Sequence, residues 1–134
     1  MLAVDQAART IAGLAVPYGP AARSGGRRWR YQPGSLRWAG PVPVLLDHVR
    51  ALRVGWVLPL ADTPTGLDVL LRIDRGELGD RVLAVAADGV YGMSPGVEMV
   101  EHRPDPTTPG VRLALAADLE EISLTRTPAF GGPP

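Results

Sequence analysis

Short apolar runs follow one another along this chain, and glycine and proline separate them at close intervals. With 16 Gly and 14 Pro among 134 residues, most runs have the length of a strand rather than of a helix. The pattern predicts strands at residues 10–18, 28–32, 42–48, 53–61, 66–74, 90–100 and 111–125, the last with a bulge. Strands in this order favour a mainly β fold, a mostly antiparallel β-barrel flanked by one or two helices.

One segment, residues 77–88, has helical periodicity instead. Its apolar residues recur at helical spacing, and these are Leu78, Val82, Val85 and Ala86. Gly89 follows as a stop signal, so a helix is predicted there. A shorter turn is expected at Pro33, and the segments 20–27 and 104–110 are expected to be irregular loops.

The length of the chain fits one domain, predicted at residues 1–130, with 131–134 as a disordered tail. Fourteen basic and fourteen acidic residues cancel, so no overall field selects nucleic acid or an anionic membrane. There is no cysteine, which suits a reducing compartment, and the first residues do not form a signal peptide. A cytosolic protein without disulfides is therefore expected.

His48 is one of two histidines, and it ends an apolar run. If residues 42–48 form a strand, alternation places Val42, Val44, Leu46 and His48 on the face toward the core. An imidazole at the end of such a strand is partly removed from water and can still reach a cleft. His48 is therefore the candidate general base, and a structural histidine at a strand end is the alternative.

Ser94 lies in the sequence GMSPG, residues 92–96, directly after the predicted helix. Glycine on both sides lets backbone amides and a substrate approach the hydroxyl closely. A serine becomes a good nucleophile only beside a base that is itself oriented by a third group. Ser94 is the candidate nucleophile, and an ordinary turn serine is the alternative.

Glu121 is the candidate for that third group. Alternation along residues 111–125 places it in an apolar row with Leu119 and Ser123, where an unpaired carboxylate would be costly. The imidazole of His48 would be a suitable partner, and so would an arginine such as Arg126 or Arg53. The remaining candidates are Glu120, Asp47 and His102, the last disfavoured because an extended chain would hold it roughly 26 Å from Ser94.

A cluster of arginines and aromatics, residues 23–31, is typical of nucleic-acid surfaces, but the rest of the chain offers no basic face to extend it. Nucleic acid is therefore an unlikely partner, and a solvated edge strand explains the cluster equally well. No His or Cys group has the spacing of metal ligands, and no glycine-rich phosphate loop is present. The sequence predicts neither a metal nor another cofactor.

The chain resembles the HK97-type phage prohead protease family, which matures capsids, through short motifs in the same order. These motifs are IAGLAVPY (11–18), YQPGSL (31–36), residues 42–48 with Gly55, then Gly66 and Leu67, the helix up to Gly89, MSPG (93–96) and LEEISLTRTPAF (119–130). The resemblance implies a serine endopeptidase with a fold like that of the herpesvirus assembly proteases. It implies His48 and Ser94 as the catalytic pair, with Glu121 as the acidic third member.

The same resemblance implies the partners. The substrates would be the phage major capsid protein with its scaffolding segment, other internal prohead proteins and the protease itself. Cleavage would take place in the host cytoplasm, inside the assembling prohead, with no membrane involved and with a homo-oligomer as one option. The alternative is a catalytically inactive module of the same fold that binds capsid or scaffold proteins through sheet edges.

Overall fold

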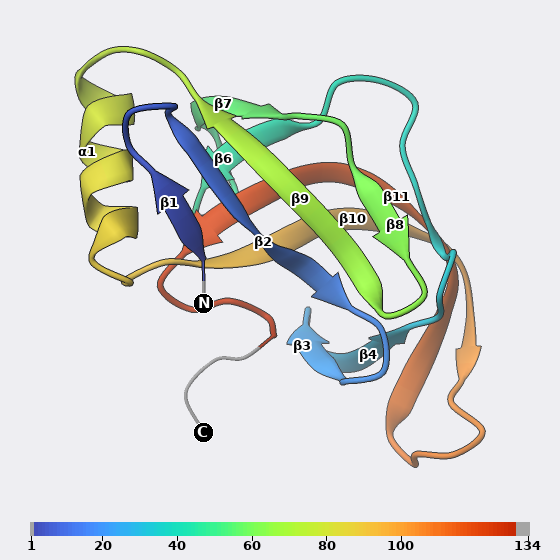
Figure 1. Ribbon diagram of the computed structural model, residues 1–134. Helices are drawn as coiled ribbons and strands as arrows, with labels where there is room; N and C mark the ends of the chain where they lie inside the picture. Colours follow the sequence, from blue (N-terminus) through green and yellow to red (C-terminus); the bar gives the residue numbers. More distant parts are fainter. Residues whose placement is uncertain (1, 131–134) are drawn as a thin grey trace.

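The computed structural model describes residues 2–130, a mainly β fold with one helix (Figure 1). Its elements are β1 (Ala3–Asp5), β2 (Thr10–Pro17), β3 (Ala22–Ser24), β4 (Arg27–Tyr31), β5 (Leu36–Arg37), β6 (Pro43–Leu46), β7 (Val49–Val57), β8 (Ala61–Thr63), β9 (Gly66–Ile73), α1 (Glu77–Ala87), β10 (Gly92–Pro104) and β11 (Val111–Thr125). The predicted tail at 131–134 lies outside the described residues.

The predicted strands are all present, but β7 (Val49–Val57) is displaced toward the N-terminus from the predicted 53–61 and β10 extends beyond the predicted end at 100. The short strands were missed. β1, β3, β5 and β8 have two or three residues each, too few for an alternating pattern to be read. The segment 20–27, expected to be an irregular loop, forms most of the β3–β4 hairpin. Gly25 and Gly26 turn it, both with positive φ (61° and 77°), as a two-residue hairpin turn requires.

Strand β11 is the centre of the sheet. It pairs antiparallel with β10 along one edge and parallel with β4, β5 and β6 in succession along the other. Residues 122–124 therefore have β10 on one side and β6 on the other. This arrangement brings β6, which is distant in sequence, beside the β10–β11 hairpin at one end of β11.

The prediction of a closed barrel is wrong, because the strands form one mixed, open sheet of 11 strands. β1 occupies the edge of β2 that would face β10, pairing with it from Thr10 to Ala12. β10 contributes Pro95, which has no N–H to donate to a further strand. β2 and β10 pack against each other without pairing, and Met93 lies beside Gly13 in this contact.

Helix α1 covers β1, β7 and β9 at one side of the sheet (Figure 1). It begins and ends within one residue of the prediction, but its buried face is Gly79, Val82, Leu83 and Ala86. Leu78 was predicted to face the core and is 40% exposed. The helix is turned because Gly79 lies against the Asp74 carbonyl, which a Cβ atom would approach to 1.9 Å.

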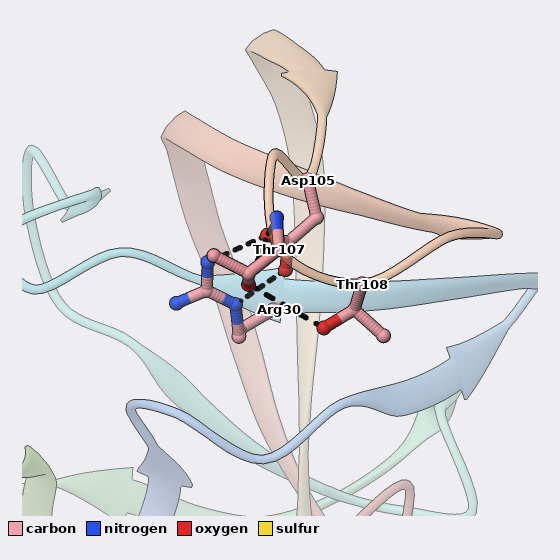
Figure 2. Close-up of polar contacts among 4 residues, drawn as sticks. All are labelled: Arg30, Asp105, Thr107 and Thr108. Atoms are coloured by element: carbon pink, nitrogen blue, oxygen red, sulfur yellow. Dashed lines mark hydrogen bonds and ion pairs between the residues drawn. The ribbon is translucent and has the colours of Figure 1, made fainter.

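A buried ion pair fixes the far end of the β10–β11 hairpin to β4 (Figure 2). Arg30 donates from Nε and Nη2 to the two carboxylate oxygens of Asp105, at 2.6 and 2.9 Å. Thr107 donates to the same carboxylate from its backbone N–H and its hydroxyl. The hydrogen bonds from Arg30 and Thr107 lower the pKa of Asp105 well below its usual range.

We expect Asp105→Asn to lower the thermal unfolding temperature at neutral pH. The folded protein keeps Asp105 ionised at pH values where the unfolded chain, with its ordinary pKa of about 3.8, takes up a proton. This stabilisation is therefore complete above that value and is lost as pH falls through the lower folded-state pKa. Thermal melts from neutral to acid pH should show wild type and Asp105→Asn converging at the acid end.

The matched control is Asp118→Asn, which removes an exposed ion pair with Arg37. Exposed pairs contribute little, so this variant should melt close to wild type at every pH. A gap between wild type and Asp105→Asn that stayed constant down to the most acid pH would contradict the linkage.

Candidate active site

His48 lies in the two-residue turn between β6 and β7, and not at the end of a strand as predicted. Leu46 pairs directly with Val49, which leaves Asp47 and His48 as the turn, with φ values of 48° and 61°. Hairpins of this type require positive φ at both positions, and Asp and His adopt it more readily than most residues. The turn therefore carries the imidazole out beyond the strand.

Two hydrogen bonds hold this turn against β11. The Asp47 N–H donates to the Leu124 carbonyl at 3.1 Å, and the His48 N–H donates to the hydroxyl of Ser123 at 2.9 Å. A left-handed backbone at a residue other than glycine costs about 1 to 3 kcal/mol, so it persists where its surroundings fix it. Ser123, completely buried, is part of that fixation.

Glu121 is the partner of the imidazole. Its Oε2 lies 2.6 Å from Nδ1 of His48, and its side chain is 6% exposed while that of His48 is 44% exposed. The predicted pairing of Glu121 with His48 is therefore present. The alternative pairings are not: Arg53 contacts Asp74, and no ion pair between Arg126 and Glu121 is found among the described residues. Oε1 of Glu121 is buried and accepts no hydrogen bond from the described residues, so His48 is the partner of this carboxylate.

Gly96 makes room for that carboxylate. It is directly opposite Glu121 in the β10–β11 pairing. A Cβ atom at position 96 would lie 2.5 Å from Glu121 Oε2 and 2.6 Å from its Cδ. Any larger residue at 96 would therefore push the carboxylate away from His48.

Ser94 lies on the same face as this pair. Ser94 is opposite Ser123, two residues along from the Gly96–Glu121 pair, and side chains two residues apart share a face of the sheet. Ser94 and His48 both line one cleft of about 460 Å³. In the part of the chain described, no hydrogen bond joins them, as is common before a substrate closes the geometry.

The cleft has an aromatic floor. Trp29 and Tyr31 of β4 line it together with Phe130, whose ring centroid is 6.1 Å from that of Tyr31. Burial raises the pKa of Tyr31 to about 12, so its hydroxyl stays neutral at physiological pH. Such a floor would accept apolar side chains beside Ser94.

The other predicted candidates for the third group lie elsewhere. Glu120 is exposed and contacts Arg50 at 3.4 Å. Asp47 is exposed in the turn beside His48, and its interaction with β11 is through its backbone N–H. His102 is opposite Ala114 near the far end of β10, where it accepts a hydrogen bond from Arg112 and contacts the edge of Trp29.

The arginines and aromatic residues at 23–31 do not form one surface, because some are buried and others are exposed. Trp29 and Tyr31 are buried in the wall of the cleft and do not lie exposed beside the arginines, and Arg30 is bound to Asp105. Arg23, Arg27 and Arg28 are exposed. Among residues 2–130, no group of three or more His, Asp or Glu side chains is placed to hold a metal ion.

Sequence reasoning missed Ser123 as part of the site, although it lies two residues after Glu121 in the same alternating row. Gly96 was expected to give close access to Ser94, but the room that it makes for the Glu121 carboxylate was missed. That role had no local signal, because it depends on the β10–β11 register.

No protein-family model matches this chain, and comparison with curated proteins finds no significant match. Among the described residues, no helix is long and apolar enough to cross a membrane. Any assignment of function therefore depends on the site itself and on the sequence motifs around it.

Proposed function

We propose that this chain is a serine endopeptidase of the prohead-protease type, with Ser94 as nucleophile, His48 as general base and Glu121 as the group that orients His48. One observation carries the proposal: a buried carboxylate holds the Nδ1 side of a half-exposed imidazole at 2.6 Å, in the wall of a cleft that also contains Ser94. A base oriented by a buried acid beside a serine is the arrangement that activates a hydroxyl for attack.

The roles of the two ring nitrogens of His48 follow from the contact with Glu121. Nδ1 of His48 is engaged by Glu121, so Nδ1 carries the proton and Nε2 is the nitrogen left to accept one. Ser94 Oγ attacks the peptide carbonyl carbon while its proton passes to Nε2. The carbon–nitrogen bond then breaks, the proton moves from Nε2 to the leaving amine, and the acyl group stays on Ser94.

Water completes the cycle. It attacks the acyl carbon, gives one proton to Nε2, and releases a carboxylic acid as Ser94 regains its proton. The buried Glu121 carboxylate stabilises the imidazolium that exists in both halves of the reaction. No cofactor takes part in these steps.

The order of the motifs along the sequence supports a proposal for the substrates. By the resemblance to prohead proteases, they are the phage major capsid protein with its scaffolding segment and the protease itself, cut inside the assembling prohead in the host cytoplasm. This chain has an open mixed sheet where that fold has a barrel, so the resemblance rests on the ordered sequence motifs between residues 11 and 130.

The direct test is covalent labelling with a fluorophosphonate, which reacts with activated serine hydroxyls. We expect intact mass spectrometry to show one adduct per chain and peptide mapping to place it on Ser94. His48→Ala should suppress the labelling, because the hydroxyl then has no base. Adducts spread over several serines, or none at all, would leave the inactive capsid-binding module as the better reading.

A further inference from the structure

The cleft is bordered by two strand edges. Three consecutive residues of β3, Ala22, Arg23 and Ser24, line it, and so do four consecutive residues of β10, 94–97. Successive side chains of a strand point to opposite faces of the sheet. A cleft that is lined by consecutive residues of one strand must therefore lie along the edge of that strand. Among the described strands β3 pairs with β4 alone, and β10 with β11 alone.

The two edges differ in what they can donate. Pro95, next to Ser94, has no N–H, so the edge of β10 lacks a donor at that position. β3 contains no proline. In a hairpin with a two-residue turn, the pair flanking the turn exchanges both hydrogen bonds and the next pair exchanges none. Ser24 and Arg27 flank the turn, so Arg23 directs its N–H and C=O toward the open edge.

The side chains of the hairpin separate into two faces. Ala22 and Trp29 are paired and buried on the face that carries the apolar cleft floor. Arg23 and Arg28 are paired and exposed on the other face. Neither guanidinium forms an ion pair with another described residue, and like charges directly opposite each other destabilise a hairpin. An anion placed between them would remove that repulsion.

From these observations we infer that the open edge of β3 is the docking edge for substrate, and that its ligand is an extended peptide alternating apolar and acidic side chains. The peptide adds to β3 as a further strand through the N–H and C=O of Arg23. Its apolar side chains then face Trp29, Tyr31 and Phe130, and its acidic side chains face Arg23 and Arg28. The inference rests on the proposed function, since it takes the cleft beside Ser94 as the substrate site.

Binding is measured separately from cleavage by using the Ser94→Ala protein. The probes are three fluorescent peptides of equal length that alternate Val with Glu, Val with Gln and Val with Lys. Fluorescence anisotropy should show the Val-Glu peptide binding most tightly and the Val-Lys peptide most weakly. Arg23→Ala should weaken the Val-Glu peptide by roughly three- to tenfold and leave the Val-Gln peptide nearly unchanged.

A second variant separates the backbone from the charge. Arg23→Pro also removes the N–H, and an edge strand tolerates proline where its N–H faces outward. It should weaken the Val-Gln peptide by about fivefold relative to Arg23→Ala, because one backbone hydrogen bond is lost. Arg81→Ala on α1 is the charge-matched control, since Arg81 does not line the cleft, and circular dichroism checks that each variant folds.

Equal affinity for the three peptides, or Arg23→Pro indistinguishable from Arg23→Ala, would overturn the docking edge. Preferential binding of single-stranded DNA through Arg23, with no discrimination among the peptides, would overturn it too. The proposed function fails separately. If the peptides bind as expected and Ser94 takes no fluorophosphonate label, the β3 edge is supported as a peptide-binding edge and the peptidase assignment is contradicted.

Discussion

Co-expressed with the capsid protein encoded in its own genomic neighbourhood, the wild-type chain is expected to trim that protein, and Ser94→Ala is expected to leave it intact. In the proposed mechanism Ser94 supplies the oxygen that becomes acylated, so Ser94→Ala removes the nucleophile. Loss of the nucleophile from such a unit lowers kcat by roughly four orders of magnitude or more. Intact masses of the capsid protein, recovered from both cultures, measure the effect.

Ser35→Ala is the matched control for this experiment. Ser35 is as buried as Ser94, at 3% against 4% exposed, and its hydroxyl has no hydrogen-bond partner among the described residues. Removing it should leave trimming unchanged. A capsid protein trimmed equally by wild type and Ser94→Ala would refute the role of Ser94. One left intact by both, yet still pulled down with the chain, would favour the inactive capsid-binding module.

The sequence was most informative about the part of the site that lies within a single strand, β11. Alternation along residues 111–125 placed Glu121 and Ser123 in one row, and both are buried in β11. A carboxylate in that row needed a partner, and the imidazole of His48 is the partner observed. Local pattern and the cost of an unpaired buried charge predicted that Glu121 has a partner, but they left an arginine as an equal alternative to His48, and the motif resemblance favoured His48.

Other features were not accessible, because they depend on pairing between distant segments. His48 was assigned to a strand, since nothing in an apolar run ending in Asp-His distinguishes a last strand residue from a turn. Its turn is defined by the pairing of Leu46 with Val49. That the sheet stays open was missed for the same reason: β1, only three residues long, occupies the edge of β2 that a barrel would need.

The site has a simple origin in the sheet. β11 brings Glu121 and Ser123, β10 brings Ser94 and Gly96 along one edge, and the β6–β7 turn brings His48 along the other. Ser123 and Glu121 both contact His48, one at its backbone and one at its ring. One strand therefore fixes both the strained turn and the orientation of the imidazole, which is how a small domain can keep a half-exposed imidazole in place.

Glu121→Gln is expected to lower kcat by roughly 10³- to 10⁴-fold while changing KM little. The amide can donate to Nδ1 as well as accept from it, so the ring is no longer held with its proton on Nδ1, and no buried charge remains to stabilise the imidazolium. The neighbouring Glu120→Gln is the control, because Glu120 is exposed and paired with Arg50. Initial rates on a peptide from the trimmed site, with thermal melts to verify folding, should separate the two variants. If Glu121→Gln turned over as fast as Glu120→Gln, the buried carboxylate would hold the turn in place without a share in catalysis.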